Sequence, residues 1–409
     1  MEPKIRFKGF EGEWKTPSIG DVFELRNGYT PSKIVKEFWE GGTIPWFRME
    51  DIRINGGFLK DALQHITPLA VKGAGLFEKN SIILATTATI GVHAMLIADS
   101  LANQRFTNFK VRKSLSDEYI DEFIYYSFFK IDEWSKNNTN SGGLLSVNMP
   151  LLVKQGFLTP CKEEQQTIAS YFRILDAKLQ ASAKKVESLK KLKSASLVAM
   201  FPQNGESTPK VRFKGFEGEW RRIKFGTISS RITRRNNTLE CKLPLTISAN
   251  EGLISQEKFF KNIVASSNLG NYYLLKRGEF AYNKSYSNGY PFGAIKRLDK
   301  YDSGVLSPLY ICFGIHDEVD SDYICFFFET TLWHKDVAER ATEGARNHGI
   351  LNIGTEDFFD IDIMIPESKE EQQAIAAYFR SLDRKIALET ARLEKLKQIK
   401  LACLDKMFV

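Results

Sequence analysis

The sequence predicts an α+β protein in which two similar mixed α/β domains are joined by two long antiparallel helices. Three observations lead to this prediction. The segment Lys4–Trp14 returns as Lys210–Trp220 with a single change. The tetrapeptide Glu163–Gln166 returns as Glu370–Gln373, and each copy opens a long amphipathic pattern. Between these repeated blocks the two halves hardly agree, so we expect a constant frame with pseudo-twofold symmetry that carries variable content.

The first domain is expected over residues 1–160. Runs rich in β-branched and aromatic residues predict strands at Ser81–Thr87 and Phe106–Val111. A helix is expected to follow them over Asp117–Phe129. The domain is therefore expected to mix short strands with helices.

The first long helix is expected over residues 161–201. Its apolar residues recur at steps of three and four with charged residues between them, which is typical of an amphipathic helix with a narrow coiled-coil-like seam. A helix of roughly 38 residues is about 57 Å long. The segment 202–209, which has a proline at each end, is expected to end the helix and to link the two halves.

The second domain, expected over residues 210–366, repeats the order of the first. Strands are predicted at Glu279–Tyr282 and Leu309–Phe313, and a helix is predicted at Asp320–Trp333. Because the elements follow the same order, we expect the two domains to share a fold although their sequences differ.

The second long helix is expected over residues 367–409. Ser368 and Glu371 have the spacing of a capping box and follow Pro366, so the start of this helix is well marked. The last residues, Met407–Phe408, match the residues with which the first helix enters its linker. We therefore expect the two ends of the chain to meet.

The apolar stripes of the two helices are expected to pack on each other. Neither stripe is stable in water, and a whole domain intervenes between the helices, so an antiparallel pair is the simplest arrangement. The alternative is that each helix packs only on its own domain. The residues predicted to pack between the helices are Ile168, Phe172, Leu175, Leu179, Val186, Leu189, Ile375, Phe379, Leu382, Ile386, Leu393 and Leu396.

The composition is that of an ordinary globular chain. Of its 409 residues, 43% are hydrophobic and 26% are charged, and the net charge is +7. The positive excess lies in the two predicted helices, so net charge alone is a weak argument for nucleic acid. Five scattered cysteines indicate neither a disulfide framework nor a zinc site. We see no signal peptide or membrane span, so a cytoplasmic location is expected.

Polar loops between the predicted elements carry side chains of the kinds that read DNA base edges. Arginine and lysine pair with guanine, asparagine and glutamine pair with adenine, and a threonine methyl group contacts thymine. In the first domain the candidate DNA-binding residues are Arg26, Asn27, Tyr29, Arg48, Thr87, Thr89, Asn103, Gln104, Arg105 and Asn140. In the second domain they are Arg231, Arg234, Arg235, Asn236, Lys284, Tyr286, Asn288, Tyr290, Arg346, Asn347 and His348. The alternative for each is an ordinary turn or cap, since asparagine, serine and glycine favour turns.

Two repeated motifs identify a family resemblance. Arg-Phe-Lys-Gly-Phe-Glu-Gly-Glu-Trp occurs at Arg6–Trp14 and Arg212–Trp220, and each copy opens a variable domain. Glu-Glu-Gln-Gln-x-Ile-Ala-x-Tyr-Phe-Arg-x-Leu-Asp occurs at Glu163–Asp176 and Glu370–Asp383, and each copy opens a long helix. In these motifs, and over essentially its whole length, the chain resembles the specificity subunit of type I restriction–modification enzymes.

The resemblance implies that residues 1–160 and 210–366 are two target recognition domains. Each would read one half of an asymmetric, split DNA site. The helices at 161–201 and 367–409 would form a spacer that sets the gap between the half-sites and docks two methyltransferase subunits. Translocating nuclease subunits would join that complex. The expected partners are therefore double-stranded DNA and these subunits, with no membrane.

No catalytic residue, cofactor or metal site is expected. The sequence contains no Walker-type phosphate loop and neither Asn-Pro-Pro nor Asp-Pro-Pro, the amino-methyltransferase signature. The leading hypothesis is a non-catalytic selector of DNA sequences. A protein-only scaffold, whose helix pair holds two partner-binding domains, is the alternative. A self-contained enzyme is disfavoured by the missing motifs.

Overall fold

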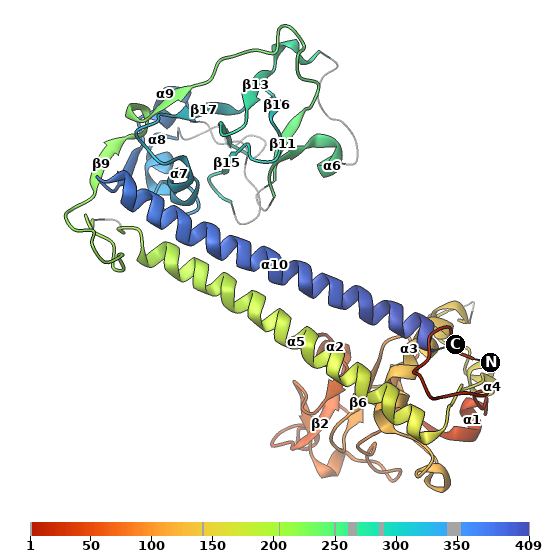
Figure 1. Ribbon diagram of the computed structural model, residues 1–409. Helices are drawn as coiled ribbons and strands as arrows, with labels where there is room; N and C mark the ends of the chain where they lie inside the picture. Colours follow the sequence, from red (N-terminus) through yellow and green to blue (C-terminus); the bar gives the residue numbers. More distant parts are fainter. Residues whose placement is uncertain are drawn as a thin grey trace. The chain divides into compact units, whose positions relative to one another are not determined.

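The computed structural model describes residues 2–140, 143–203, 205–248, 251–260, 268–285, 290–341 and 353–408. The chain forms two compact units. Unit 1 comprises Met1–Lys184 with Thr390–Val409, and unit 2 comprises Lys185–Glu389. The long helices α5 (Lys162–Ala199) and α10 (Lys369–Met407) are each divided between the units (Figure 1). Each unit thus contains one variable domain and one end of each long helix.

The variable domain of unit 1 contains a five-stranded sheet in the order β1-β8-β5-β6-β3 and a three-stranded sheet in the order β4-β2-β7. Its strands are β1 (Phe23–Asn27), β2 (Ile44–Phe47), β3 (Phe58–Leu59), β4 (His65–Ile66), β5 (Ile82–Ala85), β6 (His93–Leu96), β7 (Leu101–Ala102) and β8 (Phe106–Val111). Its helices are α1 (Ile19–Val22), α2 (Met49–Asn55), α3 (Asp121–Asn137) and α4 (Met149–Lys154), with 3-10 turns η1 (Lys36–Phe38), η2 (Pro68–Ala70) and η3 (Lys113–Leu115). Helix α3 packs against β6.

The variable domain of unit 2 contains a four-stranded sheet in the order β10-β17-β14-β15 and the strand pairs β11-β12, β13-β16 and β18-β9. Its strands are β9 (Arg221–Lys224), β10 (Ser229–Arg231), β11 (Leu245–Ser248), β12 (Gly252–Ser255), β13 (Tyr273–Lys276), β14 (Phe280–Asn283), β15 (Ala294–Arg297), β16 (Ser303–Leu306), β17 (Ile311–Ile315) and β18 (Asp362–Ile365). Its helices are α6 (Gln256–Phe260), α7 (Ser321–Phe327), α8 (His334–Arg340) and α9 (Thr355–Phe359), with 3-10 turns η4 (Phe225–Thr227) and η5 (Leu269–Asn271).

The main sheets of the two units share one topology. The order β1-β8-β5-β6 in unit 1 corresponds to β10-β17-β14-β15 in unit 2, and every neighbouring pair of these strands is antiparallel. Phe109 of β8 and Phe313 of β17 occupy the same central position, each paired with a residue on both sides. The prediction that the two domains share a fold despite their different sequences is therefore confirmed.

Two predicted helices differ from the structure. The helix expected over Asp117–Phe129 is α3, which begins at Asp121 and continues to Asn137. The helix expected over Asp320–Trp333 is interrupted, because α7 ends at Phe327 and α8 begins only at His334. Between them the Thr330 hydroxyl donates to the Phe327 carbonyl at 2.6 Å, and it accepts the N–H of Leu332 at 3.3 Å. Local hydrogen bonds of this kind compete with those of a continuing helix, which explains the break.

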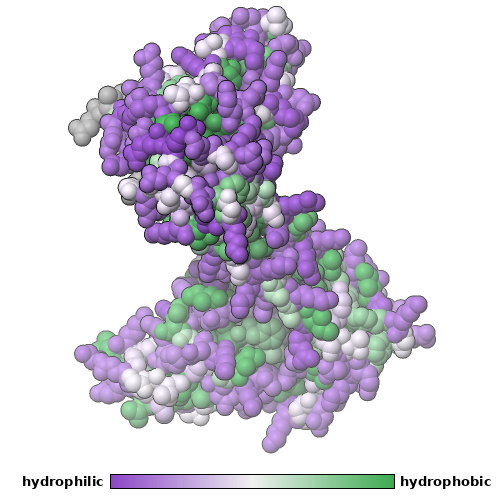
Figure 2. Space-filling model, turned by 60° about the vertical axis from the view of Figure 1, so that its left-hand side comes forward, coloured by the Kyte–Doolittle hydropathy of each residue, from purple (hydrophilic) through white to green (hydrophobic). Residues whose placement is uncertain are grey.

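The two units expose mainly polar surface. In the view of Figure 2 the surface is predominantly hydrophilic, and its hydrophobic residues form separate patches. Among the described residues, no helix combines the length and the apolar character that crossing a membrane requires.

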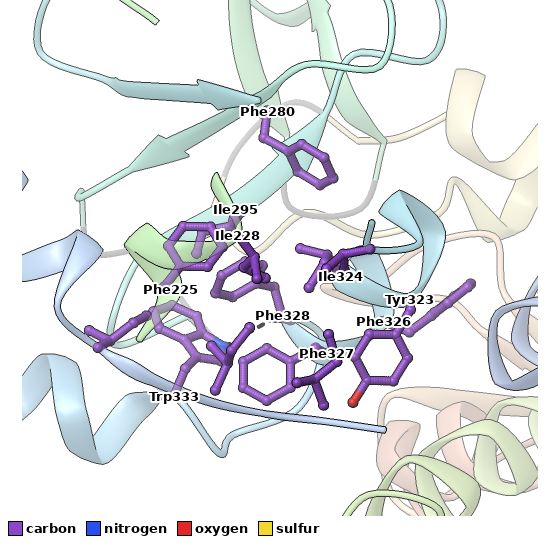
Figure 3. Close-up of a cluster of buried hydrophobic side chains, with 14 of the residues drawn as sticks. Phe225, Ile228, Phe280, Ile295, Tyr323, Ile324, Phe326, Phe327, Phe328 and Trp333 are labelled. Atoms are coloured by element: carbon purple, nitrogen blue, oxygen red, sulfur yellow. Dashed lines mark hydrogen bonds between the residues drawn. The ribbon is translucent and has the colours of Figure 1, made fainter. Parts of the chain in front are cut away.

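Each unit has an aromatic core that includes residues of the long helices. In unit 1 the ring of Phe408 packs against Phe172 of α5, with the ring centres 5.8 Å apart, and against Phe123 of α3, with the ring centres 5.7 Å apart. The core of unit 2 gathers aromatic side chains around Phe225 and Trp333 (Figure 3). Burial of one such side chain contributes about 1.5–3 kcal/mol, so each helix end is firmly attached to its domain.

The two repeated blocks of each half bind each other. In unit 1 the guanidinium of Arg6 donates to both carboxylate oxygens of Glu164 at 2.8 Å. It also donates to the carbonyls of Glu11 and Gly12. Glu164 is 0% exposed. A buried carboxylate requires such charge-assisted partners, so Arg6 allows the start of α5 to be buried there.

Unit 2 contains the same arrangement. Arg212 donates to both carboxylate oxygens of Glu371 at 2.7 Å, and to the carbonyls of Glu217 and Gly218. The Trp220 indole also donates to Glu371 at 3.3 Å. We call the pairs Arg6–Glu164 and Arg212–Glu371 the Arg–Glu clasps. The two glycines of the repeat explain part of its identity, because they have positive φ in both copies: 95° at Gly9 and 83° at Gly12 in unit 1, and 94° at Gly215 and 83° at Gly218 in unit 2.

Glutamines of the repeated tetrapeptide complete the contact with the variable domains. Gln165 accepts the N–H of Ile120 at 3.0 Å, and Gln372 accepts the N–H of Asp320 at 2.8 Å. Each also donates to the carbonyl of the proline before its helix at 3.1 Å. The repeated residues thus hold together the domain entry, the start of the long helix and the start of a helix of the variable domain, which is α3 in unit 1 and α7 in unit 2.

Only half of the capping box expected at the start of α10 is formed. Ser368 Oγ accepts the N–H of Glu371 at 3.0 Å. The carboxylate of Glu371 binds Arg212 instead of returning to the Ser368 backbone. The charge-assisted pair is the stronger interaction, so the tertiary contact replaces the local one.

The chain closes on itself as expected. The N–H of Ile5 donates to the carbonyl of Lys406 at 3.1 Å, and the N–H of Val211 donates to the carbonyl of Ala199 at 2.9 Å. These are equivalent bonds at equivalent positions of the repeat. The two chain ends consequently lie together within unit 1 (Figure 1).

We expect Arg6→Ala to destabilise unit 1 selectively. The substitution leaves Glu164 buried without its partner, which costs about 3–5 kcal/mol. Native-state hydrogen exchange should show lost protection in unit 1 and little change in unit 2. The matched variant Arg212→Ala should give the reverse distribution. Equal losses in both units from either variant would contradict a local role for the clasp.

Candidate nucleic-acid interface

Strand ends in unit 1 bring most of its candidate DNA-binding residues to one edge of the main sheet. Strand β1 ends at Asn27, which lies opposite Thr107 near the start of β8. Strand β5 ends at the same edge, with Ala85 opposite Phe106. The loops that leave these strands therefore begin side by side.

Backbone hydrogen bonds join these loops. The N–H of Asn103 donates to the Phe47 carbonyl at 3.1 Å, immediately before Arg48. The N–H of Thr86 donates to the Arg105 carbonyl at 2.9 Å. Residues that are distant in the sequence are thus brought to a common site.

The segment after β5 extends this site. Thr87 forms a β-bridge with Ser146, and the Ser146 carbonyl accepts the N–H of Asn140 at 2.9 Å. Thr89 lies beside them, since its N–H donates to the Thr87 carbonyl at 2.9 Å. We define the unit 1 edge as Asn27, Arg48, Thr87, Asn103, Gln104 and Arg105.

Side chains of the unit 1 edge differ in how many of their hydrogen-bonding groups are left free by contacts within the protein. Arg105 is exposed, and within the described residues its guanidinium has no ion pair or hydrogen bond. The side-chain oxygen of Asn103 accepts the N–H of Arg105 at 3.0 Å, and that of Asn27 accepts the Thr107 hydroxyl at 2.9 Å. Both amides are thus oriented with their NH₂ groups left to donate.

Two candidates of unit 1 have structural roles instead. Arg26 donates to the three successive carbonyls of residues 74–76, and its guanidinium lies 5.0 Å from the centre of the Phe77 ring. The hydroxyl of Tyr29 donates to the Ala70 carbonyl and accepts the N–H of Lys72. Because these groups hold the segment before β5 in place, we leave both out of the proposed interface.

Three candidate arginines of unit 2 gather around Tyr273 and Glu279. Arg235 lies over the Tyr273 ring at 4.3 Å, and Arg231 donates to the Tyr273 hydroxyl at 3.4 Å. Arg234 pairs with Glu279 at 2.6 Å. Arg231 and Arg235 are exposed. An arginine stacked on an aromatic ring is held flat, so it can present its N–H groups to a planar partner such as a base.

The remaining candidates of unit 2 are less accessible. Asn236 is 0% exposed, and its amide both donates to and accepts from the backbone of Cys241, so it is the turn residue that the alternative hypothesis describes. Lys284 is half-buried and donates to the Ile353 carbonyl at 3.2 Å, and burial lowers its pKa. Tyr290 is also half-buried. The candidates outside the described residues are Tyr286, Asn288, Arg346, Asn347 and His348.

Cross-helix contacts show that α5 and α10 run antiparallel within unit 1. Lys400 of α10 donates to Asp176 of α5 at 2.6 Å. The Tyr171 hydroxyl lies 3.3 Å from the sulfur of Cys403. As the residue number rises along α5, the number of its partner falls along α10.

Equivalent contacts occur in unit 2 with the helices exchanged. Lys193 of α5 donates to Asp383 of α10 at 2.6 Å, and the Ser196 and Tyr378 hydroxyls are 2.9 Å apart. Burial alone lowers the pKa of Lys193, but the carboxylates of Glu329 and Asp383 outweigh it and raise the pKa. The lysine is therefore held in its charged form.

The residues predicted to pack between the helices divide among the cores. Those in the unit 1 core or at its margin are Ile168, Phe172, Leu175, Leu179 and Leu396. Those in the unit 2 core or at its margin are Leu189, Ile375, Phe379 and Leu382. The others are Val186, which is buried, and Ile386 and Leu393, which are half-buried. Because Phe172 also stacks on Tyr126 of α3, the helices pack both on each other and on their domains.

The Arg–Glu clasps and the lysine–aspartate pairs across the helices were not among the candidate residues. Their positions recur in both halves of the sequence, so the repeat itself contained the signal. Their partners are distant in the sequence and could not be matched without the fold.

We expect Asp176→Ala and Lys400→Ala each to destabilise unit 1 by about 1.5–3 kcal/mol, as loss of a hydrogen bond between charged groups does. A double-mutant cycle in urea should give a favourable coupling energy. Lys178→Ala, an exposed position on the same helix, is the matched control and should change stability by less than about 0.5 kcal/mol. A coupling energy near zero would refute the pair.

Comparison with known proteins gives one family. The family described as "Type I restriction modification DNA specificity domain" matches residues 11–191 and 311–398. A curated relative is the type I restriction enzyme EcoprrI specificity subunit of Escherichia coli, 46% identical over 158 residues that cover 39% of either chain. Another is the MjaIX specificity subunit of Methanocaldococcus jannaschii, 30% identical over 185 residues that cover 44% of this chain and 42% of the relative. These matches span less than half the length of the curated relatives.

Solved structures have the same fold at low sequence identity. The S subunit of a type I restriction–modification system from M. genitalium aligns over 100% of this chain and 99% of its own, with a TM-score of 0.61 and 16% identity. A chain from a structure describing complex assembly and conformational transition of the type I R-M system aligns over 97% of this chain and 98% of its own, with a TM-score of 0.56 and 14% identity.

Proposed function

This chain belongs to the type I restriction–modification DNA specificity family, and we propose that it selects DNA sequences for an enzyme of that type. In this proposal each unit reads one half of an asymmetric, split site on double-stranded DNA, in the cytoplasm. The chain itself performs no chemical step and needs no cofactor. Methyl transfer, nucleotide-driven translocation and DNA cleavage belong to partner subunits.

The observation that carries the proposal is a contrast between the structural features that the two units share and the candidate DNA contacts in which they differ. Both units use one sheet topology and one set of clasp residues. Their candidate contacts differ, since the unit 1 edge combines amides, a threonine and arginines, whereas unit 2 offers arginines around an aromatic ring. Side chains that differ on a shared scaffold are suited to reading different bases.

The unit 1 edge also has the mixture of groups that DNA recognition requires. Arg48 and Arg105 supply positive charge for phosphates or for guanine, and the free NH₂ groups of Asn27 and Asn103 can donate to base acceptors such as purine N7. These groups come from loops that the backbone hydrogen bonds of the edge hold in place. Pre-ordered contacts lose little conformational freedom on binding.

For the two long helices we propose two roles. They hold the two readers at a set separation, so that the bases between the half-sites are not read. They also dock two methyltransferase subunits, through which the translocating nuclease subunits join the complex. The separation would follow from the length of α5 and α10, because an α-helix rises about 1.5 Å per residue.

Arg105→Ala and Arg235→Ala test whether each unit reads its own half-site. Each loss of a base contact should weaken DNA binding by about 1–3 kcal/mol and relax the sequence preference at only one half-site. Methylation of a library of DNA targets by the assembled enzyme, read by sequencing, measures both half-sites at once. The two variants are controls for each other. Loss at both half-sites from one variant contradicts the proposal, and absence of any sequence-dependent binding favours a protein-only scaffold.

Lengthening the helices tests the spacing. Seven residues inserted between Lys184 and Lys185, and seven between Glu389 and Thr390, add two turns and preserve the apolar seam. Each helix becomes about 10.5 Å longer, which corresponds to roughly three base pairs at 3.4 Å each. The methylated sites should keep both half-sites and gain a gap of that size. An unchanged gap would rule out the helices as its determinant.

A further inference from the structure

Two amide side chains of the unit 1 edge turn their carbonyl oxygens toward the protein. The Asn103 oxygen accepts the backbone N–H of Arg105 at 3.0 Å. A backbone N–H can only donate, so this bond fixes which end of the Asn103 amide faces inward. The Gln104 oxygen accepts the hydroxyl of Thr30. Both amides consequently keep NH₂ groups that no described residue bonds.

Two buried threonine hydroxyls fix the amide of Asn27 in the same orientation. Thr86 Oγ1 lies 3.0 Å from Thr107 Oγ1, which lies 2.9 Å from the Asn27 side-chain oxygen. Thr86 and Thr107 are 6% and 2% exposed, so leaving either hydroxyl proton without an acceptor would be costly. Within the described residues these side-chain groups bond only one another. Both protons find an acceptor only if Thr86 donates to Thr107 and Thr107 donates to the Asn27 oxygen. We call Thr86 and Thr107 the hydroxyl relay.

The shared fold does not require the hydroxyl relay. Thr107 precedes Phe109 by two residues in β8, and Ile311 precedes Phe313 by two residues in β17. Because the two phenylalanines are equivalent, Ile311 occupies the position of Thr107, and it is 4% exposed. An aliphatic residue thus fills the same buried position in unit 2. The hydroxyl relay is therefore a feature of unit 1, as expected of residues that set its sequence preference.

The arginines of the unit 1 edge add further donors. A guanidinium group has five N–H donors and no acceptor. The Nε atom of Arg48 is buried and has no hydrogen-bond partner, although the carboxylate of Glu50 lies 3.9 Å from it. With Arg105 and the three amides, five of the six side chains that define the edge offer donors. The exception is Thr87, whose hydroxyl can also accept.

Guanine is the base whose major-groove edge matches a set of donors. It presents two acceptors, N7 and O6, whereas adenine presents one acceptor beside an NH₂ donor and cytosine presents an NH₂ donor. An amide pairs with adenine through both of its ends, and the oxygens of Asn27 and Asn103 are already bonded within the protein. The structure therefore favours guanine over adenine as the partner of these amides.

The width of the unit 1 edge suits the major groove. The edge is built at the ends of β1, β8 and β5, which are neighbours in the main sheet. Neighbouring strands lie about 4.8 Å apart, so three strand ends span about 10 Å. The major groove of DNA is about 12 Å wide, and the minor groove is about 6 Å wide. An edge of this width reaches bases from the major-groove side, where N7 and O6 of guanine lie.

We propose that the unit 1 edge reads guanine, and that its free NH₂ groups and arginines donate to N7 and O6 of guanines in one half-site. The inference rests on the proposed function and names the base that unit 1 selects. Thr86 and Thr107 are positioning residues, because they are buried and act through Asn27. Without the hydroxyl relay the Asn27 amide could turn over and accept from adenine.

A base analogue tests the contact with guanine. The assembled enzyme methylates a library of DNA targets, and sequencing identifies the unit 1 half-site as the one that Arg105→Ala relaxes. Asn27→Ala and Asn103→Ala should each relax a position in the same half-site, and the positions relaxed by the three variants should be G·C pairs. Replacing the guanine there by 7-deazaguanine removes the N7 acceptor, so the unmodified enzyme should bind that DNA about tenfold more weakly. The variant that relaxes the position should bind both DNAs alike.

The paired change Thr86→Val with Thr107→Val tests the hydroxyl relay. Replacing both hydroxyls by methyl groups of similar shape costs little stability, because no buried polar group is left without its partner. The preference for guanine at the Asn27 position should fall about tenfold, and adenine should be admitted there. Thr246→Val, at a buried threonine of unit 2, is the matched control and should leave the unit 1 half-site unchanged. A relay that only stabilised the fold would lower binding to all targets without changing the preferred base.

The outcomes separate this inference from the proposed function. If the enzyme shows no dependence on DNA sequence, the proposed function fails. If unit 1 reads a half-site but Asn27→Ala and Asn103→Ala relax A·T pairs or no position, the reading of guanine is wrong and the proposed function stands. Equal binding of 7-deazaguanine and guanine has the same meaning. An unchanged preference for guanine in the paired threonine variant rejects the role of the hydroxyl relay.

Discussion

The structure depends on a buried ion pair that each half of the chain makes for itself. Glu164 and Glu371 sit at the starts of the long helices with almost no exposure, and Arg6 and Arg212 bind both of their carboxylate oxygens. Burying a carboxylate without such a partner is costly. The domain entry and the helix start must therefore come together before either can be buried, although some 160 residues separate them in the sequence.

This constraint leaves the intervening residues free to change. The clasp, the glutamines of the tetrapeptide and the ring pair of Phe7 with Tyr171 involve repeated side chains and backbone groups. A variable domain needs only a compatible strand order and a suitable core to fit between them. The shared order of the main sheets, with different residues at their edges, is the expected result of that freedom.

Repeated residues also hold the two long helices together. One lysine and one aspartate of each copy form two cross-helix pairs, because an antiparallel arrangement brings the aspartate of one copy to the lysine of the other. A partly buried pair is strong enough to favour one register over its neighbours. The repeat thus specifies the orientation of its own two helices without any further sequence.

The sequence by itself determined the repeat, the two long helices, the matching order of the predicted elements in the two domains, and the family. These follow from local periodicity and from identity between the two halves, which need no knowledge of distant contacts. It did not determine where α7 ends, because Thr330 and Phe327 settle that locally, nor which polar residues remain available. Arg26, Tyr29 and Asn236 resemble DNA-binding residues by type, but their partners at residues 74–76, Ala70 and Cys241 use their hydrogen bonds. Only the tertiary structure could decide this, because a side chain's free hydrogen-bonding capacity depends on neighbours that the sequence places far away.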